Sequence, residues 1–158
     1  MPVKPIPDGY HSATPYLTVN GAAEAIEFYK KAFGATERMR MSAPGGKIGH
    51  AEIQIGDSAD MLCDEFPEMC AKGPQALGGS PVAIMLYVED VDTVVGQAVA
   101  AGATLTHPVD DKFYGDRSGG IKDPFGHNWH IATHKEDLTP EEIQGRMKAF
   151  MTANCSEN

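Results

Sequence analysis

The sequence predicts an α+β fold in which two βαβββ modules are paired and their strands form a cupped, barrel-like mixed sheet. A strand-like alternation, a helical pattern and further strand-like runs follow one another in the first half of the chain, and the same order returns in the second half. Individual positions also correspond, since Val19 matches Val88 and Gly34 matches Gly102 at an offset of about 70 residues. Each sheet would have one apolar face, and two such faces are buried when the sheets curve around a shared core, which leaves a cleft between the modules.

The first module begins with a strand and a helix. The strand is predicted at Tyr16–Val19, and apolar residues at helical spacing predict a helix over Ala22–Phe33 that ends at Gly34. Turns that contain glycine separate three further predicted strands, at Thr36–Met41, Ile48–Ile55 and Ala59–Cys63.

The second module repeats this order after a connector that runs from Phe66 to Pro81. A strand is predicted at Ala83–Val88 and a helix at Val91–Ala101. The remaining predicted strands are Thr104–Pro108, Val109–Tyr114, Gly119–Lys122 and Asn128–Thr133. The last strand follows a tight Asp-Pro-x-Gly turn, in which Pro124 pre-sets φ and Gly126 takes a backbone geometry that a β-carbon would obstruct.

Two terminal segments flank the paired modules. We expect an N-terminal extension at 1–13, a domain at 14–134 with halves at 14–65 and 82–134, and a C-terminal helix and tail at 135–158. The terminal helix has the pattern of a capping box, with Thr139 as N-cap, Pro140 at the first helical position and Glu142 at the third. Its apolar stripe predicts a packing surface, for which a dimer interface is one candidate.

The composition restricts the classes of partner. The formal net charge is -9, and the 13 lysines and arginines are spread along the chain, so we expect no nucleic-acid partner. No segment is long enough to span a membrane, and prolines interrupt the first ten residues where a signal peptide needs an apolar run. The three cysteines lack metal-ligand spacing and are typical of reduced thiols, so we expect a cytoplasmic protein.

Four segments resemble a known family. They are Pro15 to Ala35, Gly49 to Glu52, Gly115 to Arg117, and Asp123 to His134. In these segments the chain resembles the vicinal-oxygen-chelate superfamily of glyoxalase I, bleomycin-resistance proteins and extradiol dioxygenases, and within it the PhnB-like branch. The resemblance implies a glyoxalase/bleomycin-resistance-type fold, a homodimer, and a small organic molecule bound in the cavity between the modules.

The resemblance also bears on metal binding. Members that carry out chemistry commonly hold a divalent metal with four side chains, and the family pattern places these at Thr14, at Met61 or Leu62, at Ala83 and at His130. Only His130 is a competent ligand, because methyl and methylene groups have no lone pairs and a threonine hydroxyl is weak. The usual metal site is therefore expected to be largely lost.

A rearranged metal site is an open alternative. His50 and Glu52 lie two positions apart on one predicted strand face, and with His130 they would supply two imidazoles and a carboxylate. This donor set suits a divalent metal such as zinc, iron, nickel or manganese. The chain would then be a metal-dependent lyase, isomerase or dioxygenase, with Glu52 as the catalytic base. The other interpretation is a hydrogen-bonded polar pair that lines the sheet.

The leading prediction is a protein that binds a small organic molecule. The residues expected to line or rim its cavity are Tyr16, His50, Glu52, Tyr114, Arg117 and His130. Arg117 could bind a carboxylate or phosphate of the ligand with its planar donors, or it could form a surface ion pair with Asp116. An antibiotic-sequestering protein with an acidic groove for cationic drugs is a further alternative, in keeping with the net charge.

Overall fold

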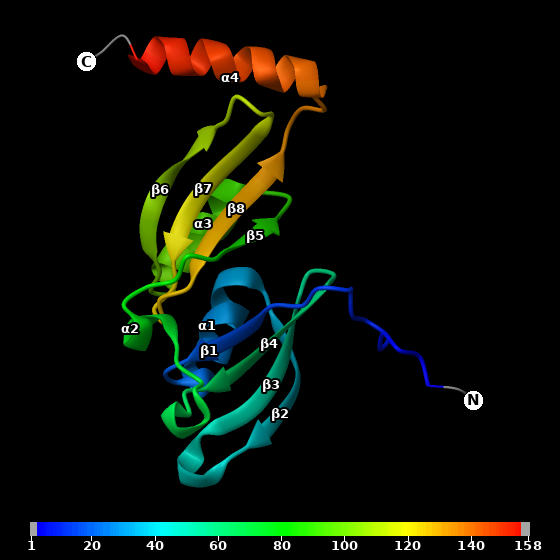
Figure 1. Ribbon diagram of the computed structural model, residues 1–158, viewed down its shortest axis with the longest axis vertical. Coiled ribbons are helices and arrows are strands. Elements are labelled where there is room, and N and C mark those ends of the chain that lie inside the picture. The colour runs from blue at the N-terminus through cyan, green and yellow to red at the C-terminus, as the bar shows by residue number, and fades with distance from the viewer. Residues whose placement is uncertain (1–2, 156–158) are drawn as a thin grey trace.

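The structure is a computed structural model that describes residues 3–155, so the outermost ends of the two predicted terminal segments, 1–2 and 156–158, lie outside the described residues. It contains two four-stranded mixed sheets, each with one helix against it, and this confirms the predicted α+β fold of paired modules (Figure 1). Module 1 consists of β1 (Tyr16–Val19), α1 (Ala22–Phe33), β2 (Thr36–Ser42), β3 (Ile48–Ile55) and β4 (Ser58–Asp64). Module 2 consists of β5 (Ala83–Tyr87), α3 (Val91–Ala100), β6 (Thr104–Asp111), β7 (Asp116–Lys122) and β8 (Asn128–His134).

The two sheets have the same topology. Their strand orders are β1-β4-β3-β2 and β5-β8-β7-β6, so the last strand of each module lies inside its sheet next to the first. The β1–β4 and β5–β8 pairs are parallel, with Thr18 opposite Cys63 and Met85 opposite His130, and the other pairs are antiparallel. The identical order confirms the internal repeat.

The prediction for the segment that follows α3 in module 2 was wrong. Two strands were expected at 104–108 and 109–114, whereas a single strand, β6, runs through Pro108 to Asp111. The register of β6 against β7 shifts between His107 and Asp110, and β6 is an edge strand. An edge strand with a bulge tolerates a proline because the missing N–H is not needed for pairing there.

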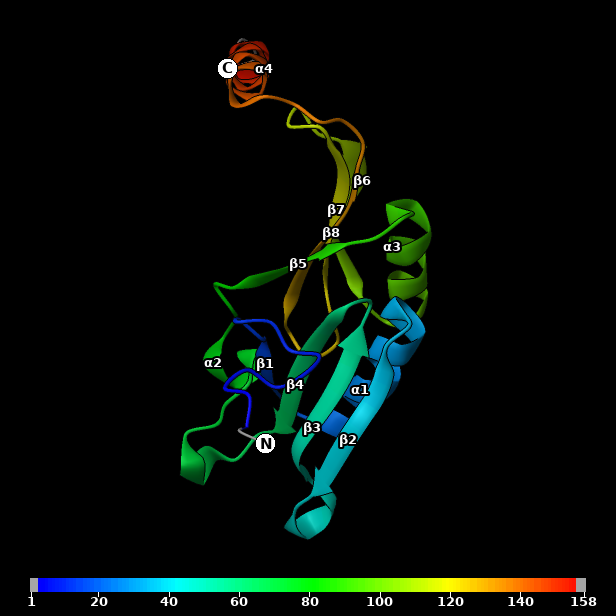
Figure 2. The same ribbon diagram turned by 90° about the vertical axis from the view of Figure 1, so that its right-hand side faces the viewer.

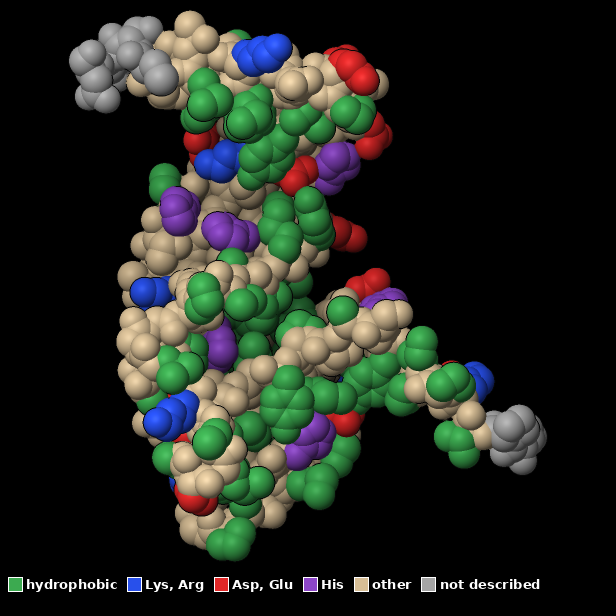
Figure 3. All heavy atoms as spheres, viewed as in Figure 1, with side chains coloured by type: hydrophobic (Ala, Val, Ile, Leu, Met, Phe, Trp, Pro, Cys, Tyr) green, Lys and Arg blue, Asp and Glu red, His purple; other side chains and the backbone are tan. Residues whose placement is uncertain are grey.

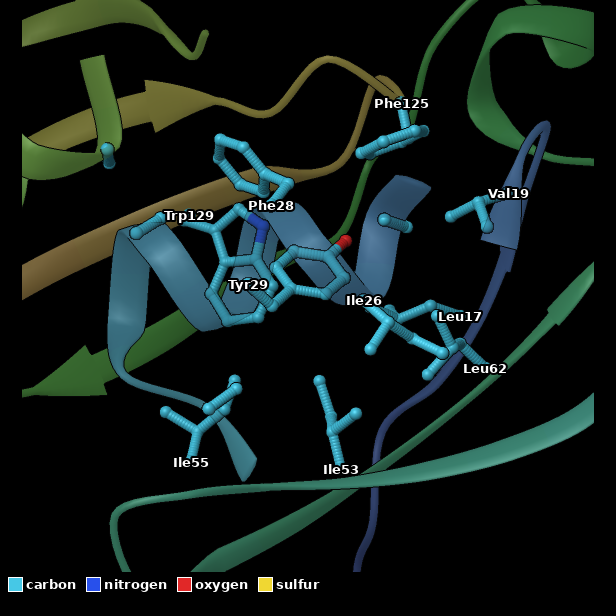
Figure 4. Close-up of a cluster of buried hydrophobic side chains, with 14 of the residues drawn as sticks. Leu17, Val19, Ile26, Phe28, Tyr29, Ile53, Ile55, Leu62, Phe125 and Trp129 are labelled. Carbon is cyan, nitrogen blue, oxygen red and sulfur yellow. The ribbon is translucent and has the colours of Figure 1, made fainter. Parts of the chain in front are cut away.

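The helices α1 and α3 lie together on one side of the two sheets. Figure 2 shows α1 and α3 side by side, with the opposite faces of both sheets turned away from them, and these two uncovered surfaces are called the open faces below. Aromatic rings fill the space between the helices and the sheets, and Trp129 is only 1% exposed, as predicted for a core residue (Figure 4). Its ring centroid lies 5.5 Å from that of Tyr29 and 4.7 Å from that of Phe33.

The predicted Asp-Pro-x-Gly turn lies between β7 and β8 of module 2 and is hydrogen-bonded to module 1. Asp123 is 4% exposed, and its Oδ2 accepts hydrogen bonds from the Tyr29 hydroxyl at 2.7 Å and from Trp129 Nε1 at 2.9 Å. Its Oδ1 accepts hydrogen bonds from the backbone N–H groups of Phe125 and His127, both at 2.9 Å. A fully satisfied buried carboxylate therefore fixes the shape of the turn and binds it to α1 of module 1.

One short helix lies between β2 and β3, two short helices lie in the connector, and a longer helix follows module 2. They are η1 (Pro44–Gly46), η2 (Pro67–Met69), α2 (Pro74–Leu77) and α4 (Pro140–Cys155). The capping box at α4 is confirmed, because the Thr139 N–H donates to Glu142 Oε2 at 2.8 Å and the Glu142 N–H donates to Thr139 Oγ1 at 3.3 Å. The Phe150 ring of α4 packs against Phe113, with 5.4 Å between centroids. No helix within residues 3–155 is both long and apolar enough to cross a membrane.

Candidate functional site

The open face of module 1 carries a group of polar side chains. Residues alternate along β1, so that Leu17 is buried toward α1 whereas Tyr16 is 52% exposed on the open face. Along β3 the same alternation leaves His50 and Glu52 on the open face, where their side chains are 23% and 17% exposed. The structure therefore brings together three of the six predicted pocket residues.

These side chains form a continuous hydrogen-bonded array. Tyr16 Oη lies 2.9 Å from His50 Nδ1, and His50 Nε2 lies 3.4 Å from Glu52 Oε1. The hydroxyl of Tyr10 donates a hydrogen bond to the other carboxylate oxygen, Glu52 Oε2. We refer to Tyr10, Glu52, His50 and Tyr16 as the open-face array.

Tyr10 was not predicted as a site residue. It lies in the N-terminal segment before β1, and the Arg38 guanidinium lies over its ring at 4.6 Å from the centroid. No periodic pattern in the sequence marks this segment, and the contact with Glu52 joins positions 42 residues apart. The only signal in the sequence is the amphipathic character of tyrosine itself, which carries a hydroxyl at the end of an apolar ring.

A cavity lies between the N-terminal segment and the sheet. Its volume is about 560 Å³, which is within the range of about 300 to 1,000 Å³ that is usual for small-molecule sites. Its wall consists of Pro5, Ile6, Pro7, Tyr10, His11, Ser12, Thr14, Glu52 and Met61. Among the described residues of this mostly apolar lining, Glu52 is the only carboxylate.

The array keeps Glu52 in its charged form. The hydrogen bond from Tyr10 lowers the pKa of Glu52 below its ordinary value, and the hydrogen bond from His50 acts in the same direction, against the effect of partial burial. Burial and the neighbouring carboxylate raise the pKa of Tyr10. The cavity therefore has a negative charge in its wall at neutral pH.

His130 lies on the open face of the other module. It is opposite Met85 in β5, and its ring centroid is 6.0 Å from that of His107. It lines a separate cavity of about 340 Å³ and does not line the cavity at Glu52. In the part of the chain that the structure describes, no three His, Cys, Asp or Glu side chains are arranged to hold a metal ion.

The residues expected to hold the usual metal do not provide suitable donors. Met61 lies in β4 directly opposite Glu52 and presents a thioether, and Ala83 at the start of β5 has only a methyl group. Thr14 in the cavity wall has a neutral hydroxyl. This set does not fit a site that needs several imidazole or carboxylate ligands.

The other two predicted pocket residues have partners within module 2. Tyr114 Oη lies 3.3 Å from Ser118 Oγ. Arg117 donates to Asp92 through Nε at 2.7 Å and Nη2 at 2.8 Å. The expected ion pair of Arg117 with Asp116 is not formed; Arg117 pairs with Asp92, and with Asp111 at 3.2 Å.

Asp116 belongs to a polar network that was not predicted. Its Oδ2 accepts a hydrogen bond from Tyr87 at 2.9 Å, and its Oδ1 lies 2.7 Å from His134 Nδ1. The other ring nitrogen of His134 lies 3.0 Å from Asp137 Oδ1. The hydrogen bond with Asp116 raises the pKa of His134 most, and the hydrogen bond with Asp137 raises it further. The shared strand parity of His130 and His134 was the signal available in the sequence.

Comparisons with known proteins agree on one family. The model of the Glyoxalase/Bleomycin resistance protein/Dioxygenase superfamily matches residues 10–131. An uncharacterized protein of Mycobacterium tuberculosis is 42% identical over 139 residues, which cover 86% of this chain and 82% of that protein.

Solved structures share the fold. The crystal structure of an Arabidopsis thaliana gene product is similar with a TM-score of 0.63 and 27% identity, covering 78% of this chain and 98% of that one. The PhnB protein from Bacillus cereus has a TM-score of 0.58 and 19% identity, covering 78% of this chain and 99% of that one.

Proposed function

Because the chain belongs to the glyoxalase/bleomycin resistance/dioxygenase superfamily, we propose that it is a PhnB-like protein that binds a small organic molecule at the open-face array without the usual metal. The single observation that carries this proposal is the ionised Glu52 in the wall of a mostly apolar cavity of about 560 Å³. Binding pockets of small molecules typically combine an apolar lining with a few placed polar groups.

The charge of the site favours a cationic, amphipathic ligand. Glu52 would accept hydrogen bonds from a cationic group, while Ile6 and Met61 would contact an apolar part of the same molecule. The net charge of -9 supports this choice, because it raises the local concentration of cations around the protein. Sequestration of a cationic drug is one form that this function would take.

A homodimer is part of the proposal. The open faces expose large apolar side chains, of which Tyr16 is 52%, Met85 45% and Tyr87 58% exposed. Figure 3 shows hydrophobic side chains on the viewed face of both modules, with histidines among them. A second copy laid against these faces would remove this apolar surface from water.

Metal-dependent catalysis is the competing proposal, and one observation favours it. His50 and Glu52 already lie on one face and are joined by a hydrogen bond. A third ligand has to come from elsewhere, and His130 on the open face of module 2 of a second copy is the candidate. Metal analysis of protein purified without chelators tests this: a stoichiometric transition metal that is lost in His130→Ala would replace the metal-free proposal.

The metal-free proposal is tested by a thermal-shift screen in the presence of a chelator. The screen compares cationic amphipathic molecules with neutral and anionic molecules of the same carbon skeleton at pH 7.5. We expect the cationic members to raise the Tm of the wild type and of Glu68→Gln, a matched change at an exposed glutamate of the connector, but not of Glu52→Gln. A flat response, or an equal response in Glu52→Gln, would contradict the proposal.

A further inference from the structure

A second cavity lies where the N-terminal segment, the β3–β4 turn region of module 1 and β5 of module 2 meet. Its volume is about 130 Å³, and it is more enclosed than the cavity at Glu52. Its wall consists of His11, Ala13, Thr14, Pro15, Ile55, Ser58, Ala59, Asp60, Ile84, Met85, Leu86 and Trp129. Both modules therefore contribute to it, and the N-terminal segment closes it.

Strand parity separates the side chain of Asp60 from the open-face array. Met61 is opposite Glu52 in the β3–β4 pair, and both lie on the open face. Asp60 precedes Met61 and points to the opposite face, toward α1. His11 and Thr14 line both cavities, but the two carboxyl groups, Glu52 and Asp60, belong to different cavities.

Asp60 differs from the other buried aspartates. It is 4% exposed, and within residues 3–155 its carboxyl group, which lies in the cavity wall, has no hydrogen bond or ion pair with another side chain or with the backbone. Asp64, four positions further along β4, accepts hydrogen bonds from the backbone N–H groups of Gly21, Ala22 and Ile48 at 2.9, 2.9 and 2.7 Å. Asp123 accepts four. Burying a carboxyl group without a donor is costly, so a donor supplied from the cavity would account for Asp60.

We propose that this cavity is a second ligand site, which binds a small alkylammonium ion with its ammonium group on Asp60 and its carbon chain against Ile84, Leu86 and Trp129. An ammonium group has three N–H donors and no acceptor, and this complements a carboxylate without donors. The opposing wall from module 2 is apolar and suits a hydrocarbon chain. The volume is close to that of an engineered cavity of about 150 Å³ that holds benzene, which limits the ligand to a few carbon atoms.

The charge state of Asp60 governs this site. Burial raises the pKa of Asp60 to about 6, so the carboxylate form predominates at pH 7.5. His11 in the wall and Tyr29 on α1 are the titratable groups that face Asp60, and the described wall residues from β5 and β8 add none. Binding should therefore weaken about tenfold at pH 5, where only a minority of the molecules carry the charge.

The experiment uses n-butylammonium chloride as the probe, with n-butanol and sodium butyrate as controls. Trp129 is the only tryptophan of the chain and lies in the cavity wall, so its fluorescence reports occupancy directly. At pH 7.5 we expect a saturable change with butylammonium, at a concentration at least tenfold lower than for butanol. The change should persist in Glu52→Gln. Because that substitution tests the proposed function at the other cavity, failure of one proposal can be told apart from failure of the other.

Two variants complete the test. Asp60→Asn should weaken butylammonium binding at least tenfold, whereas Asp57→Asn, an exposed aspartate on the turn before β4, should leave it unchanged. Ile84→Phe reduces the cavity with Asp60 intact and should also abolish binding. The proposal is overturned if the wild type gives no saturable change, as a cavity that holds only water would, if butanol binds as tightly, or if Asp60→Asn binds as well as the wild type.

Discussion

The hydroxyl of Tyr29 donates a hydrogen bond of 2.7 Å to Asp123, and this bond joins the helix of module 1 to the turn before the last strand of module 2. Tyr29 is fully buried and Asp123 is 4% exposed. The Asp123 carboxylate depends on all of its hydrogen-bond donors, because at this depth a lost donor is not replaced by water.

Tyr29→Phe should therefore destabilise the protein by about 1 to 3 kcal/mol, since it leaves a buried carboxylate short of one donor without changing the shape of the ring. Urea unfolding at pH 7.5 measures this change. Tyr114→Phe is the matched control, because its hydroxyl makes a single 3.3 Å contact at 36% exposure. An equal effect of the two substitutions would show that the Asp123 interaction adds nothing.

Asp60→Asn should stabilise the unliganded protein at pH 8. The pKa of Asp60 is raised from 3.8 to about 6, so the folded state disfavours the charged form, and this penalty develops as the pH rises from 3.8 to 6. Asparagine removes the penalty, for a gain of about 3 kcal/mol above pH 7 and little at pH 4. Urea unfolding from pH 4 to 8 checks the prediction, with Asp57→Asn as control. A gain that does not depend on pH would contradict it.

Tyr10→Phe should raise the pKa of Glu52 toward its ordinary value. The pKa of Glu52 is lowered in the folded state, so the array stabilises the protein above the unfolded-state pKa of Glu52, and this stability is lost as the pH falls through the folded-state pKa. The variant should lose about 1 kcal/mol at pH 7 and progressively less at acidic pH. NMR titration of the Glu52 carboxyl carbon measures the pKa. Tyr16→Phe, which removes the hydroxyl next to His50 and leaves the contact of Tyr10 with Glu52 intact, should leave that pKa nearer the wild-type value.

Asp116→Asn should lower the pKa of His134, because Asp116 is the larger of the two influences that raise it. Asp137→Asn should lower it by a smaller amount. A raised histidine pKa contributes stability that is present at acidic pH and is lost as the pH rises through the folded-state pKa. NMR titration of the His134 ring protons follows both variants, and a larger effect of Asp137→Asn would reverse the assigned order.

The module architecture was predictable because its signals are local and occur twice. Alternation, helical spacing and glycine turns mark each element of the βαβββ unit, and Val19 and Val88 align the two copies. The error at β6 came from Pro108, which usually interrupts a strand. The tolerance of an edge strand depends on its neighbours in the sheet, and the sequence does not reveal these.

The candidate site was predictable only in part. Strand parity placed His50 and Glu52 on one face correctly, since parity is a property of a single strand. It could not place Tyr10, which reaches Glu52 from a segment without periodicity, nor find Asp92 as the partner of Arg117, 25 positions away. Such contacts depend on how whole elements pack, so they emerge only with the tertiary structure.

The position of β8 inside its sheet bears on how the chain is synthesised. β5 pairs only with β8 in the described sheet, and β8 ends at His134, about 50 residues after β5 begins. When β5 to β7 have left the ribosome, β8, which lies between β5 and β7 in the sheet, has not yet emerged. Module 2 can close only after β8 arrives, so a nascent chain stopped before it would expose two unsatisfied strand edges to chaperones and proteases.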